Sequence, residues 1–272
     1  MLYDNKIYKI QNITNIHVGS GDTNFGIVDN LVQRDVLTNY PVIHSSSLKG
    51  AIREFFEFYK NDDEFIRHIF GDEDKNPGNV VFTEANLLGI PFRSRDYPYV
   101  FCMSDESIKT LVDKMESLNI DNELSSKLKK YINLTEVKSN VNTVIEDMEV
   151  KKNDELKDLV EFTGEENIAV FPHSEFKKLL EDLPVVARNQ LENGKSVNLF
   201  YEEFVPRRSQ FFTIISFPKL ERVSKNKKFN DKEKIGKFYE EFQNMLTSET
   251  DLVQIGANAT IGYGLCKFKE VK

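Results

Sequence analysis

Short apolar runs alternate with amphipathic segments along the whole chain. Runs rich in β-branched and aromatic residues predict strands over residues 7–16, 79–90, 97–103, 168–171 and 211–217. Apolar residues spaced three and four apart predict helices over residues 45–59, 63–70, 104–118, 122–131, 173–181 and 235–246. This order of elements, without an internal repeat, predicts an α+β fold in which insertions are attached to one core.

Two turn signals join pairs of strands. Asn193-Gly194 separates residues 183–191 from residues 195–200, and both turn positions tolerate a positive φ, so a β-hairpin is predicted. Near the C-terminus, a glycine-rich run joins the strands expected at residues 252–255 and 265–271. Its small residues let backbone amides approach an anion such as a nucleic-acid phosphate, although a tight turn between core strands fits the same pattern.

Two other segments lack a clear pattern. A small-residue loop starts at His17 and continues to Pro41. Residues 133–167 are polar and acidic, which predicts an insertion or a mobile flap.

Composition limits the functional classes. The chain has 272 residues, of which 40% are hydrophobic, enough for a sizeable core. It lacks a basic and apolar leader and any apolar run of the ~18 residues that a membrane helix needs, so a cytoplasmic protein without a membrane partner is expected. Two cysteines in apolar runs, Cys102 and Cys266, and four scattered histidines argue against disulfides and a zinc site.

The net charge of -8 argues against a nucleic-acid ligand, because such ligands select a basic surface. The distribution of charge changes this picture, since acidic residues concentrate away from the motif-bearing segments. The helix expected from residue 45 begins with serines and carries Lys49 and Arg53 four residues apart, beside a helix N-terminus. These features predict an anion site, and an ordinary solvated helix face is the alternative.

Several motifs stand in one order along the chain. They are Gly-Ile-Val-Asp-Asn-Leu-Val-Gln-Arg at 26–34, Pro-Val-Ile-His-Ser-Ser-Ser-Leu-Lys-Gly-Ala-Ile-Arg at 41–53, Val-Phe-Thr-Glu-Ala at 81–85 with Pro-Phe-Arg-Ser at 91–94, Tyr-Glu-Glu-Phe-Val-Pro at 201–206, and the C-terminal glycine loop. In this order they resemble the RAMP superfamily of CRISPR proteins, and within it the backbone subunits of type III-B (Cmr) effector complexes. The resemblance covers nearly the whole chain. It departs at His44-Ser45, where Pro-Gly is common, and at Ala257, which replaces a usual glycine and requires an ordinary φ.

The resemblance implies a single RAMP domain over residues 1–272 with an RRM-like (ferredoxin-like) palm and an inserted helical subdomain. Fingers and helical elements would lie at about 46–130, a variable insertion at about 133–167, a β-hairpin thumb at about 183–200, and the glycine-rich hairpin at 252–271. It also implies partners: a guide crRNA, a target RNA, further copies of the chain stacked along the guide, and other subunits of the Cmr complex. The same subunit would cleave the target at regular intervals.

The resemblance places the catalytic aspartate at Asp29. Spacing alone does not separate it from Asp22 or Asp35, and His17 and Glu203 are secondary candidates for proton transfer or metal positioning. A divalent metal, Mg or Mn, is expected, with Asp29 as a possible ligand, but no zinc and no organic cofactor. The residues expected to bind RNA are Arg34, Ser46, Ser47, Lys49, Arg53, Arg188, Gly256, Asn258, Thr260, Gly262, Tyr263 and Gly264.

Three alternative functions remain open. One is a non-catalytic RNA-binding backbone subunit of a related effector. Another is a guide-processing RAMP endoribonuclease, although its histidine-rich site is not evident in the sequence. The third is a ferredoxin-like enzyme unrelated to RNA.

Overall fold

A computed structural model describes residues 2–21, 28–60, 62–72, 76–223 and 231–271. Ten described strands form one sheet in the order β13-β14-β1-β12-β4-β5-β9-β6, with β2 paired to β4 and β3 to β12. All neighbours in this sheet are antiparallel except β5 and β9. The strands of the sheet are β1 (Tyr3–Asn12), β2 (Val42–Ile43), β3 (Val81–Phe82), β4 (Ala85–Phe92), β5 (Val100–Ser104), β6 (Lys138–Ser139), β9 (Ile168–Phe171), β12 (Gln210–Pro218), β13 (Val253–Gln254) and β14 (Leu265–Glu270).

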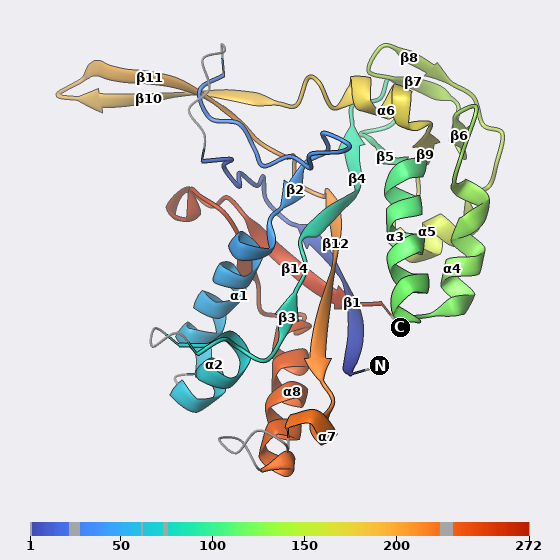
Figure 1. The fold of residues 1–272 in the computed structure, drawn as a ribbon. Coiled ribbons are helices and arrows are strands. Elements are labelled where there is room, and N and C mark those ends of the chain that lie inside the picture. The colour runs from blue at the N-terminus through green and yellow to red at the C-terminus, as the bar shows by residue number, and fades with distance from the viewer. Residues whose placement is uncertain (1, 22–27, 61, 73–75, 224–230, 272) are drawn as a thin grey trace.

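Helices lie on both sides of this sheet (Figure 1). On one side are α1 (Ser45–Lys60), α2 (Asp63–Phe70), α7 (Leu220–Val223) and α8 (Lys232–Leu246). On the other are α3 (Asp105–Leu118), α4 (Asn122–Leu128) and α5 (Lys157–Thr163), while α6 (His173–Leu179) follows β9. The predicted mixed architecture of helices and strands is confirmed. No helix within the described residues is long and apolar enough to cross a membrane.

Successive side chains along a strand point to opposite faces of the sheet, so the same strands contribute to a hydrophobic core on each face. Ile7 packs in the cluster that contains α3 residues, whereas its neighbour Tyr8 packs with α1 and α8. Phe211 and Phe212 divide between the clusters in the same way. The sheet is therefore buried on both faces over its centre, which explains why β12, β5 and β9 read as nearly continuous apolar runs.

Two further strand pairs stand outside the large sheet. β10 (Val185–Glu192) and β11 (Lys195–Glu203) form a hairpin that projects from the body, and β7 (Thr143–Ile145) pairs with β8 (Met148–Val150). At the turn of the first hairpin, Asn193 and Gly194 have φ values of 49° and 76°, so the hairpin predicted from this dipeptide is confirmed.

Some sequence-based boundaries were wrong. The first strand covers Tyr3–Asn12 rather than residues 7–16, and Ile16 makes only an isolated bridge to Val205. Residues 122–131 form α4 followed by a 3-10 turn, Lys129–Tyr131. Tyr59 continues the apolar spacing that predicts α1, but it is exposed, whereas Phe55 and Phe56 in the preceding turn are buried.

For residues 133–167, the expectation of a mobile flap without a clear pattern was wrong, whereas the expectation of an insertion stays a prediction. The expected insertion or mobile flap contains β6, β7, β8 and α5. Leu156 and Leu159 are fully buried and belong to the cluster around α3. The segment is thus part of the packed body, and it even buries polar residues such as Ser139 and Glu165.

Candidate functional site

The loop after β1, the base of the β10–β11 hairpin and the C-terminal glycine loop meet at one corner of the molecule. The loop after β1 forms a parallel bridge between Asn30 and Glu202 and an antiparallel bridge between Ile16 and Val205. The backbone carbonyl of His17 accepts a hydrogen bond of 2.9 Å from the amide of Ala257. Three distant parts of the sequence therefore share one surface, which contains most of the predicted site residues.

Asp29 lies at the exposed edge of this corner. Its Oδ2 accepts a 2.8 Å hydrogen bond from the amide of Tyr201, and its own amide donates to the Tyr201 carbonyl at 3.0 Å. These two bonds fix the loop against β11. Among the described residues, Oδ1 of Asp29 has no partner, so one carboxylate oxygen faces solvent on a firmly held backbone.

The other aspartates of the loop differ. Asp35 Oδ1 accepts hydrogen bonds from the amides of Leu37 and Thr38, at 3.0 and 2.8 Å, so its carboxylate closes a local turn. Asp22 lies outside the described residues. Asp29 is the described aspartate of this loop whose carboxylate is both exposed and held at the base of the hairpin.

Glu203 has a structural environment. Its side chain is buried, with Oε2 accepting from the Val32 amide at 3.0 Å and Oε1 lying 2.5 Å from the Arg34 guanidinium. Both oxygens are thus engaged, and the pair pins the loop that carries Asp29. Arg34 also donates to the Asn39 carbonyl at 2.9 Å, so the guanidinium expected to bind RNA is used within the fold.

His17 is buried beneath the same corner. Its Nδ1 lies 2.6 Å from the Glu203 carbonyl oxygen, and its Nε2 lies 3.9 Å from Oε2 of Glu202. The imidazole therefore contacts protein on both of its nitrogens. A role in orienting the corner fits this environment better than direct proton exchange with a ligand.

Glu202 was missed by the sequence reading as a site residue. Its buried Oε1 accepts from Nε of Arg188 at 2.7 Å and from Nδ2 of Asn258 at 2.9 Å. The guanidinium of Arg188 also lies over the ring of Tyr263, 4.9 Å from its centroid. Glu202 thus joins the hairpin to the glycine loop, and alternation along β11 could not have revealed it, because Glu203 beside it is buried as well.

The glycines of the C-terminal loop have different reasons to be glycine. Gly256 and Gly264 have φ values of 88° and 76°, and an added Cβ would lie 2.3 Å from the His17 carbonyl oxygen or 2.0 Å from that of Ile255. Gly262 has a φ of 81°, but nothing lies within 4 Å of its added Cβ. The first two are required by packing, whereas the open side of Gly262 leaves room for a ligand. Ala257 has no positive φ, as expected.

The remaining loop residues are accessible. Thr260 is exposed in a 3-10 turn, Ala259–Ile261, that follows Asn258 with its φ of 67°. Tyr263 is half-buried, with Arg188 over its ring and Phe204 in an edge contact 6.1 Å away between centroids. Its ring is therefore already stacked on one partner.

The N-terminal turns of α1 stand beside the loop after β1. Nε2 of Gln33 donates to Ser47 Oγ at 3.1 Å and to the Gly19 carbonyl at 3.2 Å. Ser46 remains exposed. Gln33 is nearly buried and connects the two segments, a role that the sequence did not reveal.

Lys49 and Arg53, the two cations in the first half of α1, differ in their surroundings. Arg53 pairs with Glu57 at 2.7 Å, whereas Lys49 has no ion-pair partner within the described part of the chain. Partial burial, and next the nearby Arg53, lower the pKa of Lys49. Lys49 is therefore the predicted cation most available to a phosphate.

Metal-binding clusters were sought among the described residues. None of them forms a group of three or more His, Cys, Asp or Glu side chains suited to hold an ion. Cys102 and Cys266 are buried free thiols whose pKa values are raised by burial. A single exposed carboxylate such as Asp29 fits a largely hydrated Mg²⁺ that takes its other ligands from water and phosphate.

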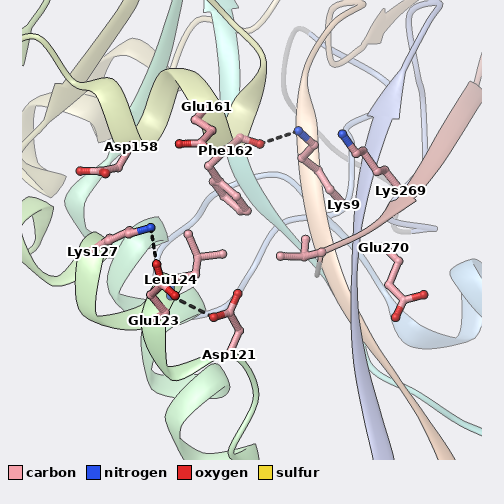
Figure 2. A pocket seen from close by; sticks show the side chains of 11 residues that line it. Lys9, Asp121, Glu123, Leu124, Lys127, Asp158, Glu161, Phe162, Lys269 and Glu270 are labelled. Carbon is pink, nitrogen blue, oxygen red and sulfur yellow. Dashed lines mark hydrogen bonds and ion pairs between the residues drawn. The ribbon is translucent and has the colours of Figure 1, made fainter.

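A separate cavity of about 410 Å³ lies between the sheet and the α4–α5 side (Figure 2). Lys9 reaches into it from β1 and donates to the carbonyl of Phe162 at 2.8 Å. Burial, together with the adjacent Lys269, lowers the pKa of Lys9 to about 8. Carboxylates of Asp121, Glu123, Asp158, Glu161 and Glu270 also line the cavity, and none of the predicted site residues does. This acidic lining is unsuited to a phosphate chain.

The model of the RAMP superfamily matches residues 9–267. The Cmr endoribonuclease Cmr4 of Pyrococcus furiosus is 28% identical over 293 residues, covering 95% of this chain and 94% of the relative. A shorter match, 37% identical over 123 residues, links 42% of this chain to 39% of a CMR subunit Cmr4 of Saccharolobus solfataricus.

Solved structures share the fold. A chain in the cryo-EM structure of a type III-B Cmr-beta bound to cognate target RNA superposes with a TM-score of 0.79 at 23% identity, covering 99% of this chain and 98% of that one. The crystal structure of oligomeric Cmr4 from Pyrococcus furiosus gives a TM-score of 0.73 at 21% identity, with 100% of each chain covered. Since the family model spans almost the entire sequence, this chain belongs to the RAMP superfamily.

Proposed function

We propose that this protein is the backbone subunit of a type III-B CRISPR effector complex, that it binds a guide RNA, and that it cleaves complementary target RNA. The observation that carries the proposal is Asp29, an exposed carboxylate bonded to the backbone of Tyr201 where the hairpin leaves the body. The relative named as a Cmr endoribonuclease and the Cmr-beta chain bound to target RNA support the same function.

The core of the fold is proposed to be an RRM-like palm. Strands β14, β1, β12 and β4 are neighbours in that order, and all are antiparallel. Helix α1 follows β1, and α8 connects β12 to β14, which supports a βαββαβ unit with the strand order of a ferredoxin-like sheet. The β10–β11 hairpin would be the thumb, and α2 to α5 would belong to the inserted elements.

RNA cleavage at this corner would use the 2′-hydroxyl of the substrate as the nucleophile. Asp29 would accept the proton of that hydroxyl or hold a hydrated Mg or Mn ion beside the scissile phosphate. A bound ion would supply charge stabilisation for the oxygens of the reacting phosphate. Lys49, the α1 N-terminus and the glycine loop would hold the guide backbone through phosphate contacts.

Copies of the chain would stack along the guide RNA together with other Cmr subunits. Each copy would present one Asp29 and one projecting hairpin, so the cut sites in the target would recur at a fixed spacing. The products would carry a cyclic phosphate at their 3′ ends, because the nucleophile is internal to the RNA.

The test is Asp29→Asn in a guide-loaded complex. This substitution keeps the side-chain size and removes the charge, so target affinity should be unchanged while the cleavage rate falls by roughly 10²-fold or more. Asp113→Asn on α3, which also removes an exposed carboxylate, is the matched control and should cut at the wild-type rate. If Asp29→Asn cuts at the wild-type rate and gives the same ladder, the cleavage site lies elsewhere. If the wild-type protein itself does not cut the target, a non-catalytic backbone subunit is favoured.

Chelation gives a second reading of the same assay. Removal of divalent ions should stop cleavage of a pre-bound target and leave the target bound. Cleavage that persists in chelator would remove the metal from the proposal and leave Asp29 as a proton acceptor.

A further inference from the structure

The turn after Arg34 exposes two aliphatic side chains. Val36 and Leu37 are 94% and 91% exposed, more than any other large hydrophobic side chain within the described residues. Most exposed apolar residues on a protein surface stand alone and need no explanation, but here two of them are adjacent at the tip of a loop. Neither contributes to the core.

The turn is held in one conformation by its own hydrogen bonds. Asp35 Oδ1 accepts from the amides of Leu37 and Thr38 and from the Thr38 hydroxyl, at 2.8 to 3.0 Å. Asn39, with a φ of 62°, donates its amide to the Asp35 carbonyl at 2.9 Å and receives the Arg34 guanidinium on its own carbonyl. A tip fixed in this way loses little conformational freedom when it binds a partner.

The tip continues into a shallow hollow of about 200 Å³. Leu37, Pro41 and Leu87 supply apolar surface to it, and Glu84, Glu106 and Lys114 stand among its lining residues. Tip and hollow together form one surface with an aliphatic centre and charged residues. This is the composition of a protein interface rather than of an RNA groove, which needs cations and aromatic faces.

We propose that this surface, the Val36–Leu37 tip with the adjoining hollow, docks onto a second copy of the same chain. The inference rests on the proposed function, in which copies stack along a guide RNA. A chain of the same fold has been crystallised in oligomeric form, which argues for a second copy over an unrelated protein. Leu37 belongs to the tip and also lines the hollow, so tip and hollow form one continuous surface that a neighbouring copy would contact.

The first experiment compares assembly on guide RNA for three versions of the full chain by light scattering after gel filtration. Replacing both aliphatic residues, by Val36→Ser and Leu37→Ser, should weaken association between copies by roughly 10-fold or more, as expected for apolar anchors of an interface. Phe58→Ser, which removes a side chain that is 81% exposed on α1, is the matched control and should assemble like the wild type. The melting temperature of the double variant should not change, because neither side chain is packed.

The second experiment identifies what the tip contacts. Both native cysteines are buried, so Val36→Cys provides a single accessible thiol for a photo-crosslinker. Irradiation of the assembled complex should join position 36 to a peptide of a second copy, whereas a label on Phe58→Cys should not give that product. Crosslinks only to RNA or to another subunit would overturn the proposal.

The outcomes separate this inference from the proposed function. If the wild-type chain fails to assemble on guide RNA, both are overturned. If it assembles and cuts target RNA while the double variant does so equally well, the proposed function stands and the docking surface is rejected.

Discussion

Two neighbouring groups of carboxylates at the base of the hairpin behave in opposite ways. Glu202 and Glu203 are buried, and their carboxylates accept from Arg188, Asn258, Arg34 and the backbone amide of Val32. Asp29 is hydrogen-bonded to Tyr201, the residue before Glu202 on β11. It is exposed, and one of its carboxylate oxygens accepts from the Tyr201 amide. The buried pair holds three segments together, whereas Asp29 keeps one carboxylate oxygen without a partner among the described residues, so adjacency in space does not imply a shared environment.

The largest expected effect comes from breaking the buried pair. Glu203→Ala removes the buried carboxylate that accepts from the Val32 amide and pairs with the Arg34 guanidinium. Removal of one partner of a buried ion pair costs about 3–5 kcal/mol, so the free energy of unfolding should fall by about 3 kcal/mol. Chemical denaturation measures it.

Asp29→Asn, in contrast, should leave the free energy of unfolding within about 0.5 kcal/mol of the wild type, because the exposed carboxylate contributes little to the packing of the corner. If Glu203→Ala were equally harmless and instead reduced cleavage, Glu203 would belong to the chemistry and the division between the two groups would fail.

His68, a buried histidine elsewhere in the molecule, tests through the pH dependence of stability whether buried ionisable groups serve the fold. His68 on α2 is fully buried, its Nε2 lies 3.2 Å from the Tyr239 hydroxyl, and burial lowers its pKa from 6.5 to about 4. The unfolded chain therefore binds more protons between these two values, and stability is lost as the pH falls from about 6.5 to about 4. The loss from this group should approach about 3 kcal/mol.

The measurement is the unfolding free energy of the wild type and of His68→Gln at pH 7 and pH 4.5. Carboxylates titrate in both proteins, so the difference between them isolates His68. An identical pH dependence in the two proteins would show that His68 is not held neutral by the fold.

The contrast between buried and exposed groups explains how far the sequence could be read. Periodicity predicted α2 and β9 at their observed bounds, because local pattern and packing agree there. It missed α5, whose short apolar stripe is hidden among acidic residues. The boundary of β1 was shifted because its first residues gain their pairing only from β12, two hundred residues later.

The sequence named candidate site residues but could not give their burial. It offered Asp29 and the glycine loop as separate candidates, and only the structure brings their segments to one corner. The engagement of Arg34 and Arg188 could not be predicted, since it depends on carboxylates 169 and 14 residues away. Long-range pairing decides which charges remain for a ligand.

Substitution of the cations on α1 should have a smaller effect, a decrease in guide RNA affinity and in its salt dependence. Lys49→Ala should weaken guide RNA binding for all sequences and lower the log-log salt slope by about one unit, since one phosphate contact is lost. Arg53→Ala should change the slope less, because Glu57 already neutralises that guanidinium. Filter binding over a range of salt concentrations measures both, and equal slopes for Lys49→Ala and the wild type would remove Lys49 from the interface.

The smallest effect is expected at Gly262, where a side chain would have no packing contact within the fold and could interfere only with a ligand. A side chain there meets open space but must adopt a φ of 81°, which costs about 1–2 kcal/mol for a residue other than glycine. Gly262→Leu should therefore leave the protein folded while the bulky side chain blocks close approach of an RNA backbone and lowers guide affinity. Gly262→Ala introduces the same backbone strain with a much smaller side chain, so it is the control for the cost of a positive φ. Equal guide affinity for the leucine and alanine variants would show that no RNA approaches this side of the loop, and the loop would then serve only as a tight connection between β13 and β14.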